Sequence, residues 1–185
     1  MDNTSINKNN ESSNSQVPEQ SNISHNNKEL DNIIKVDTFI KSKTMLGHTD
    51  SVYCLIKFDD KTIISGSNDN SIKTWDVDKG ECINTFLGHT HYVWCLIKFN
   101  ETTIVSGSYD KSIKMWNVDK GECIKTFLGH TNTVRSLIKL NESTIVSGSE
   151  DCSIKMWKVD SGECSKTIKN NTEVWSLLKL MQLLS

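Results

Sequence analysis

A four-residue sequence, Leu-Gly-His-Thr, occurs three times in this chain of 185 residues, and it returns at a constant step. The copies start at Leu46, Leu87 and Leu128, so the two intervals between neighbouring copies are equal. A fixed period of this length indicates that one structural unit is built repeatedly and that neighbouring units pack on each other, because so small a unit cannot bury its own apolar face. The chain therefore has to fold as an array of similar units.

Other sequences keep the same step, which makes the repeat far more specific than one short motif. A Trp follows each His at the same distance along the chain, and in the first copy it begins the pair Trp75-Asp76. Ser-Gly-Ser-x-Asp and Gly-Glu-Cys also recur at equivalent positions in all three copies. From Leu46 to about Ile168 the chain thus resembles the WD40 family, whose repeats open with Gly-His and carry Trp-Asp near their end. The resemblance implies a β-propeller in which each repeat is a four-stranded blade.

The first copy has the residue pattern of β-strands. Apolar residues occupy every second position from Val52 to Phe58, a period of two that predicts an inner strand. Turn-forming residues separate three further segments, at 62–67, 71–77 and 81–86. The pattern therefore predicts four strands per repeat.

The chain divides into a polar leader and the repeats. Residues 1–36 are dominated by Asn, Ser, Gln, Lys and Glu without apolar periodicity, which predicts a disordered tail. Residues 37–185 are the predicted WD40 region. The three full repeats and the partial fourth occupy 46–86, 87–127, 128–168 and 169–185.

We predict an all-β fold: an open, partial WD40 β-propeller of three four-stranded blades plus flanking strands. One flanking strand is expected at 41–45, which aligns with the outer strand of a repeat, and another at 173–180, which aligns with the inner strand of the third copy. Such an arc cannot close, so both end blades should expose apolar faces that neighbours normally cover. Self-association, a partner that supplies further blades, or a gene product that has lost its remainder are the three explanations left open.

Composition excludes several classes of function. The formal net charge of −2 argues against binding of duplex nucleic acid, and no segment approaches the roughly 20 apolar residues of a membrane span. No secretory signal opens the sequence, so we expect an intracellular protein, cytoplasmic or nuclear. The six cysteines are mostly copies of two repeat positions and lack metal-ligand spacing, which predicts buried, reduced thiols and no metal or cofactor.

Each copy contains a His, a Ser and an Asp at constant spacing, followed by the Trp. Taken alone, this set has the composition of a hydrolase triad, but a hydrolase needs one set beside an oxyanion hole and this chain has three. The resemblance to WD40 repeats implies a structural network instead, in which Asp accepts a hydrogen bond from His, His contacts Ser, and Ser contacts the indole N–H. The twelve residues are His48, Ser65, Asp69, Trp75, His89, Ser106, Asp110, Trp116, His130, Ser147, Asp151 and Trp157.

A second group of positions changes its chemistry from copy to copy while the scaffold stays nearly constant. These positions flank the inner-strand Val and precede the turn Asp, where the resemblance implies partner binding on one rim of the propeller. Tyr, Trp and Arg are common there, and these residue types are enriched in binding hot spots. The alternative is that some of the rings fill space between blades. The predicted partner-binding residues are Tyr53, Tyr92, Trp94, Tyr109, Arg135, Glu150 and Trp175.

The function expected from these features is a non-catalytic protein–protein interaction scaffold or adaptor, with a protein or peptide as partner. Self-association is a further possibility, because it would cover the open edges of the arc. The alternative is a degenerate or truncated WD40 gene product without an independent function, and a hydrolase using the His-Ser-Asp set is the least favoured interpretation.

Overall fold

The computed structural model describes residues 44–177, in which twelve β-strands and no helix are present. The predicted disordered tail, 1–36, lies outside the described residues, as do residues 178–185 of the partial fourth repeat. No helix of the described part could span a membrane. An all-β fold is therefore what the period-two pattern produces.

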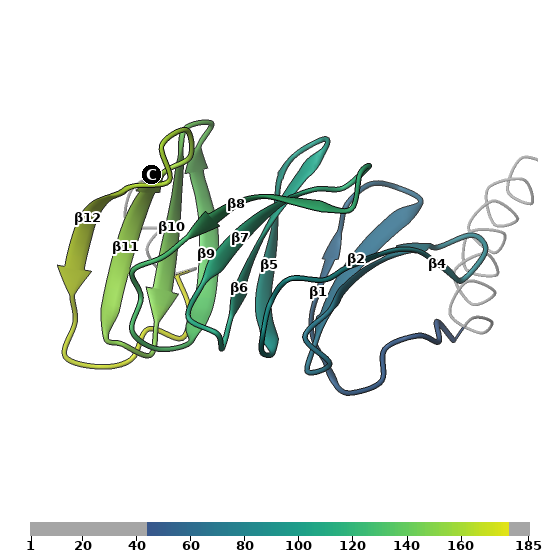
Figure 1. Ribbon diagram of the computed structural model, residues 1–185, viewed down its shortest axis with the longest axis horizontal. Helices are drawn as coiled ribbons and strands as arrows, with labels where there is room; N and C mark the ends of the chain where they lie inside the picture. Colours follow the sequence, from purple (N-terminus) through teal and green to yellow (C-terminus); the bar gives the residue numbers. More distant parts are fainter. Residues whose placement is uncertain (1–43, 178–185) are drawn as a thin grey trace, which may run out of the picture. The chain divides into compact units, whose positions relative to one another are not determined.

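The strands form three separate four-stranded antiparallel sheets, one for each repeat, that stand side by side in an open arc (Figure 1). In each sheet the strands follow one another in chain order, so every connection is a short hairpin turn. The prediction of an open propeller with three four-stranded blades is confirmed. The strands of the first sheet are β1 (Val52–Lys57), β2 (Thr62–Ser67), β3 (Ile72–Asp76) and β4 (Glu81–Phe86). The second sheet has β5 (Val93–Asn100), β6 (Thr103–Ser108), β7 (Ile113–Asn117) and β8 (Glu122–Phe127). The third has β9 (Val134–Asn141), β10 (Thr144–Ser149), β11 (Ser153–Lys158) and β12 (Cys164–Lys169).

The apolar core lies between the sheets. One cluster joins the first sheet to the second, for example through Phe86 and Trp116, and another joins the second to the third through Phe127 and Trp157. Both faces of the middle strands are covered, and all six residues of β6 are buried. Stacking of neighbouring sheets is thus what removes apolar surface from water in this fold.

The outer strands are the most exposed, and this overturns the expectation of buried thiols at one repeated position. Cys82, Cys123 and Cys164 are exposed on β4, β8 and β12, whereas Cys54 and Cys95 are half-buried on inner strands. The reason is that an outer strand pairs on one side only and lies at the periphery of its sheet. All six cysteines are free thiols.

The predicted flanking strands, 41–45 and 173–180, lie only partly within the described residues. Their described parts, Thr44, Met45 and 173–177, belong to no strand, while 41–43 and 178–180 lie outside the described residues. The second segment is nevertheless docked: Val174 and Leu177 are buried against Ile138 and Val146 of the third sheet. Within residues 44–177, the inner-strand face of the first sheet is therefore uncovered, and the corresponding face of the third sheet is covered in part.

Candidate interaction surface

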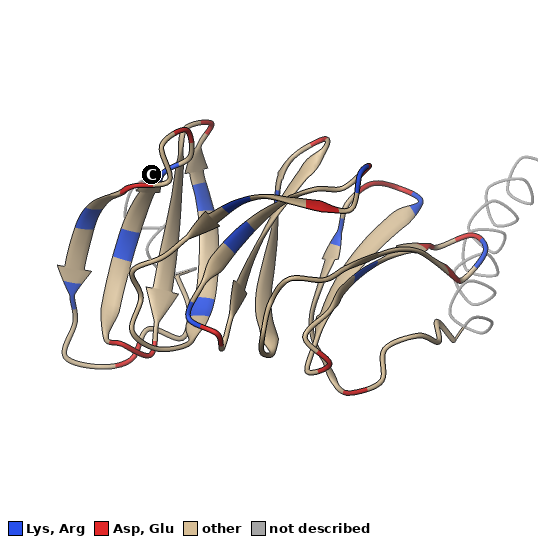
Figure 2. Ribbon diagram, in the orientation of Figure 1, with Lys and Arg blue, Asp and Glu red and all other residues tan. Residues whose placement is uncertain are grey.

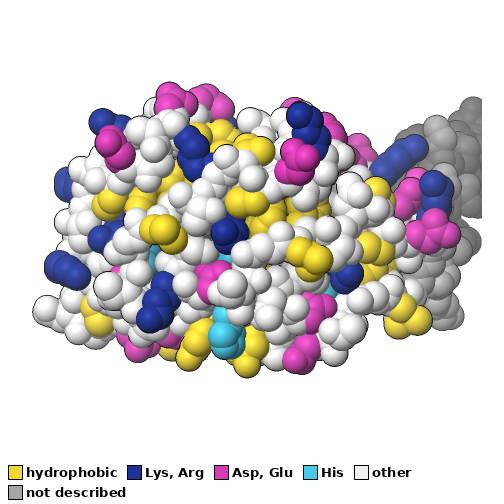
Figure 3. Space-filling view, viewed as in Figure 1, with side chains coloured by type: hydrophobic (Ala, Val, Ile, Leu, Met, Phe, Trp, Pro, Cys, Tyr) yellow, Lys and Arg dark blue, Asp and Glu magenta, His cyan; other side chains and the backbone are white. Residues whose placement is uncertain are grey.

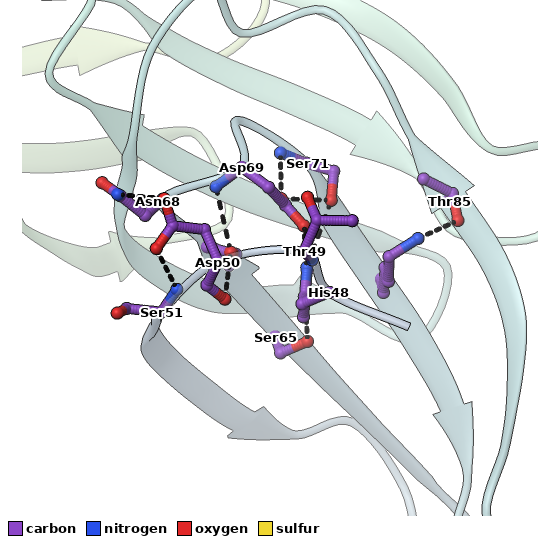
Figure 4. A network of polar contacts seen from close by, with 12 residues as sticks. His48, Thr49, Asp50, Ser51, Ser65, Asn68, Asp69, Ser71 and Thr85 are labelled. Atoms are coloured by element: carbon purple, nitrogen blue, oxygen red, sulfur yellow. Dashed lines mark hydrogen bonds and ion pairs between the residues drawn. The ribbon is translucent and has the colours of Figure 1, made fainter. Parts of the chain in front are cut away.

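Each repeat contains the same chain of hydrogen bonds, and Figure 4 shows the part of it that joins Ser65, His48 and Asp69 in the first sheet. His48 Nδ1–H donates to Asp69 over 2.8 Å, Nε2 contacts the Ser65 hydroxyl at 2.7 Å, and Trp75 Nε1–H donates to the same hydroxyl at 2.7 Å. Asp69 also accepts from the Thr49 N–H. The network ties the loop before the inner strand to the turn between the second and third strands.

The second and third repeats reproduce this geometry closely. The distances from His Nδ1 to Asp, from His Nε2 to Ser and from Trp Nε1 to Ser are 2.7, 2.7 and 2.8 Å in the second repeat and 2.7, 2.7 and 2.7 Å in the third. The residues are His89, Asp110, Ser106, Trp116, His130, Asp151, Ser147 and Trp157. Three equal copies indicate a feature of the scaffold.

The charges within the network are fixed by burial and hydrogen bonding. Burial alone would raise the pKa of Asp151, but hydrogen bonds from Ser153 and from the Thr131 N–H outweigh it and lower that pKa to about 2. The pKa values of the turn aspartates of the other two repeats are lowered by the same balance. Burial lowers the pKa of His130, although Asp151 acts in the opposite direction. At neutral pH the third network therefore contains a carboxylate and a neutral imidazole.

The serine of each network is buried and hydrogen-bonded within its own blade. Ser106 and Ser147 are 0% exposed, and each hydroxyl is held between an imidazole and an indole. A serine hydrolase needs its hydroxyl open to a substrate carbonyl and beside oxyanion donors. The hydroxyls of Ser106 and Ser147 are buried and already paired with an imidazole and an indole, so they are not open to a substrate.

The predicted rim residues of the inner strands lie next to one another across the sheets. Tyr53 stacks on Trp94 with ring centroids 4.1 Å apart, and the Arg135 guanidinium lies 3.9 Å from the centre of a Trp94 ring. The same guanidinium is 4.6 Å from a Trp175 ring. These four side chains form a continuous row, which we call the rim ladder, and it links all three sheets to the C-terminal segment.

A β-bulge explains why these side chains reach the rim. In each inner strand the pairing register shifts by one residue, and the extra residue is Tyr53 in β1, Trp94 in β5 and Arg135 in β9. A bulge leaves its extra residue out of the ladder and redirects its side chain. The three repeats therefore use one backbone irregularity to present three different side chains.

The remaining predicted residues extend this surface. The ring centroids of Tyr92 and Tyr109 are 5.6 Å apart. The ring of His91, a residue that the sequence analysis did not single out, lies with its centroid 4.3 Å from that of Tyr109. Its only sequence signal is its position beside the variable Tyr92. Glu150 accepts hydrogen bonds from Arg135 and so fixes the guanidinium in its place on the ladder.

One polar atom of the ladder has no partner among the described residues. Trp94 Nε1 is buried and makes no hydrogen bond. Trp94 is half-buried because Tyr53 and Arg135 cover its ring, so this side chain fills space between neighbouring inner strands as well as contributing to the rim. The structure thus combines the two interpretations that the sequence left open for this residue.

Charges elsewhere are mixed in sign. Acidic residues lie mainly in loops and basic residues mainly on strands (Figure 2), and hydrophobic, basic and acidic side chains alternate on the face in Figure 3. Lys57, Lys98 and Lys139 each pair with an acidic residue three positions later. Among the described residues no group of three or more His, Cys, Asp or Glu side chains could hold a metal ion.

A family model described as "WD domain, G-beta repeat" matches residues 40–76, 80–117 and 121–158, which is more than half of the chain. The chain belongs to the WD40 family. The solved WD40 β-propeller domain of Doa1 is similar, with 28% identity and a TM-score of 0.67 over 72% of this chain and 46% of that one. U3-55K and the RRP9 WD40 repeats each match with 28% identity and a TM-score of 0.66, over 71% of this chain and 43% of theirs. A search of curated proteins found no match.

The family assignment agrees with the geometry of both groups of residues. The chain spans a little under half the length of the propeller structures it matches. Its His-Ser-Asp-Trp networks each join a loop, a turn and two strands of one WD40 blade. The rim ladder is the part of these blades that differs from repeat to repeat.

Proposed function

We propose that this WD40 protein is a non-catalytic scaffold or adaptor that binds a protein or peptide on its rim. The single observation that carries the proposal is the rim ladder together with the tyrosines beside it. The three repeats are nearly identical elsewhere, yet at the bulge they present Tyr, Trp and Arg in turn. Variation confined to one aligned surface is expected where a template has been adapted to contact a partner.

The chemistry of the rim favours a polypeptide partner. Tyr53, Tyr109 and Trp175 are large aromatic side chains that are exposed, and large aromatic residues and arginine dominate the energetics of protein interfaces. Stacking and the Glu150 ion pair hold Trp94 and Arg135 in place before a partner arrives, so little side-chain entropy is lost on binding. The mixed charge gives no track for a nucleic-acid backbone.

The burial of the network serines supports the non-catalytic part of the proposal. A hydrolase would have to expose Ser65, Ser106 or Ser147 by breaking bonds that hold its own blade together. The family is consistent with a scaffold role. We further propose an intracellular location, in the cytoplasm or the nucleus.

The test is selection of peptides from a phage-displayed library with the full chain, followed by binding measurements on rim variants. Tyr109→Ala and Trp175→Ala should weaken binding of the selected peptides at least tenfold, the usual loss at a hot spot. Ile124→Ala, on the exposed part of β8, is the matched control and should leave binding unchanged. Selected peptides that bind all variants equally would refute a binding role for the rim. Failure to select any peptide, combined with aggregation of the chain, would favour the alternative of a degenerate product.

A further inference from the structure

A Val-x-x-Leu sequence in the inner strand is the central contact between neighbouring sheets. In β5, Val93 and Leu96 are 0% and 6% exposed because the first sheet covers them. The corresponding residues of β9, Val134 and Leu137, are 0% and 5% exposed beneath the second sheet. The two interfaces inside the molecule thus show what normally covers this sequence: the far face of the preceding blade.

A glycine on the preceding sheet provides the hollow for the valine. A Cβ added to Gly66 would lie 2.6 Å from Val93 Cγ1, and one added to Gly107 would lie 2.7 Å from Val134 Cγ1. Only glycine leaves enough room for the valine at this position. The hollow is therefore specific for the valine of the next inner strand.

A lysine two residues after the leucine strengthens the same contact. Lys98 Nζ donates to the backbone oxygen of Phe58 at 2.8 Å, and Lys139 Nζ donates to that of Phe99 at 2.7 Å. Each ammonium group also lies within 4.8 Å of the centre of the same phenylalanine ring. Each interface thus pairs a Val-x-x-Leu-x-Lys strand with a glycine hollow and a carbonyl acceptor.

The first sheet also has a Val-x-x-Leu-x-Lys strand, β1, but none of the described residues covers it. Val52 and Leu55 of β1 are 52% and 60% exposed, and Lys57 pairs with the exposed Asp60. A hollow of about 260 Å³ lies over this face, with Val52, Leu55 and Ile63 among its lining residues. Ile104, the counterpart of Ile63 in the second sheet, is fully buried.

The third sheet carries the other half, and the C-terminal segment occupies its centre. A Cβ added to Gly148 would meet Val174 Cγ1 at 2.5 Å, so Val174 fills the hollow that Val93 and Val134 fill elsewhere. Val174-Trp175-Ser176-Leu177 repeats the Val-x-x-Leu sequence without forming a strand. The segment therefore occupies the place of an inner strand.

The outer part of the same face stays open. Ile168 is 41% exposed, whereas Phe127, its counterpart in the second sheet, is 1% exposed between two sheets. Leu140 is exposed as well, whereas Phe99 is buried at the equivalent position. A short segment covers the glycine hollow, but a full blade would be needed to cover this face.

We propose that β1 of one copy of this protein docks on the third sheet of a second copy and displaces the segment 173–177. Val52 enters the hollow at Gly148, Leu55 takes the place of Leu177, and Tyr53 stacks on Arg135 where Trp175 lay. Lys57 donates to the backbone oxygen of Leu140, as Lys98 and Lys139 do to their neighbours. The segment 173–177 is an internal competitor that limits this pairing.

The pairing is head-to-tail, because it joins different faces of the two copies. Such an interface gives a closed ring or an open polymer, depending on the rotation between copies. The part of this chain that matches the Doa1 propeller covers 46% of that domain, so two copies correspond to most of its length. A closed pair with twice the 20.9 kDa mass of one chain is therefore expected.

The experiment measures the mass of the full chain by sedimentation equilibrium over a range of concentrations. Val174→Asp combined with Leu177→Asp should free the hollow and tighten self-association at least tenfold, because the docked segment no longer reduces the available fraction of the site. Leu55→Arg should abolish self-association without loss of folding, since Leu55 is exposed. Leu87→Arg is the matched control, because Leu87 is 75% exposed and lies in the loop between β4 and β5, and it should self-associate like the unmodified chain.

Complementation tests the direction of the contact. Leu55→Arg damages the β1 face and Gly148→Leu fills the hollow on the other face, so each variant alone should be monomeric. Mixed in equal amounts, they should form a one-to-one dimer through the one intact interface. A mixture that stays monomeric while both variants keep their β-sheet circular dichroism would overturn the head-to-tail pairing.

The proposal also fails if the Val174→Asp/Leu177→Asp protein is folded and monomeric, as would be found if another protein covers these faces. Tyr109→Ala, which lies outside the proposed contact between copies, should weaken peptide binding without altering the mass, so the two proposals can fail independently.

Discussion

Ser106 offers the strongest single test of the structural role of the networks. Its hydroxyl is 0% exposed, contacts His89 Nε2 at 2.7 Å and accepts the Trp116 Nε1–H at 2.8 Å. Replacement by Ala removes both contacts and leaves a buried donor and a buried acceptor without partners. Each such group costs about 1–3 kcal/mol, so the free energy of unfolding should fall by about 2–6 kcal/mol. Against a typical total of about 5–15 kcal/mol this is a large loss.

A double-mutant cycle isolates the orphaned indole N–H. Trp116→Phe removes the donor, so in the double variant with Ser106→Ala no N–H is left unpaired. The double variant should therefore be less destabilised than the sum of the two single changes, by about 1–3 kcal/mol. Urea unfolding followed by circular dichroism measures all four proteins without relying on the replaced Trp. Ser143→Ala is the control, because the hydrogen bond of that hydroxyl is exposed, and it should change stability by less than about 0.5 kcal/mol.

Two results would contradict this account. If Ser106→Ala unfolds within about 0.5 kcal/mol of the unmodified chain, the hydroxyl is not the hub that its contacts indicate. If the cycle is additive, the indole N–H has another partner in the variant. Hydrolytic activity that disappears in Ser106→Ala while stability is unchanged would instead revive the hydrolase interpretation.

The same geometry supports three further predictions. His89→Ala should lower the free energy of unfolding by about 1–3 kcal/mol in urea titrations and remove no catalytic activity. Gly107→Ala should cost about 1–3 kcal/mol, because its Cβ would lie 2.6 Å from Cys95 Sγ, and crowding of this kind is relieved only by moving the strand; an unchanged urea midpoint would contradict the packing described. Acid should destabilise the third repeat in two steps. The pKa of His130 is lowered in the folded state, so stability should decrease as the pH falls below about 6.5; the stabilising contribution of the Asp151 carboxylate is complete above about pH 4 and should be lost as the pH falls towards 2. Thermal melts from pH 8 to pH 2 measure both steps, and stability that rises on acidification would refute this prediction.

The architecture was accessible from the sequence because the repeat supplies the same information three times. Alternation of apolar residues from Val52 to Phe58 predicts the inner strand, and the spacing from His48 to Trp75 agrees with a network that joins three parts of one sheet. Such local patterns are decided by side-chain periodicity and turn chemistry. The burial of the cysteines was predicted less well, because period-two patterning does not distinguish an inner strand from an outer strand that lacks a neighbour. Cys82 is exposed for that reason.

The rim could be located from the sequence, but its structure could not. The variable positions identify Tyr53, Trp94 and Arg135 as a group, yet nothing in their spacing shows that each is the extra residue of a β-bulge. A bulge is a property of pairing between strands, so it becomes visible only when both strands are placed. Stacking between the three residues depends in turn on the distance between sheets, which the repeat length does not specify.

The C-terminal segment shows how a small change in spacing alters the role of a repeated sequence. Val174 lies one position closer to Val134 than Val134 lies to Val93, and the Gly-His that begins each full repeat is missing before it. Without that His no network anchors the segment to a turn, and the Gly148 hollow, apolar contacts and Arg135 on Trp175 hold it in place. Two hydrogen bonds to the third sheet add to these contacts: Val174 N–H donates to the Ser149 backbone oxygen at 3.0 Å, and Leu177 N–H donates to the Ser136 hydroxyl at 3.0 Å. An inner strand such as β5 or β9 is held in addition by a continuous ladder of hydrogen bonds to the next strand of its own blade.

The segment should therefore open far more readily than β5 or β9. Backbone amides near Val174 should exchange with solvent much faster than those of Val93 and Val134 in hydrogen-exchange measurements, because local opening of the segment breaks fewer interactions. Equal protection at these positions would mean that the segment is as firmly held as a strand, and it could then no longer act as a displaceable competitor.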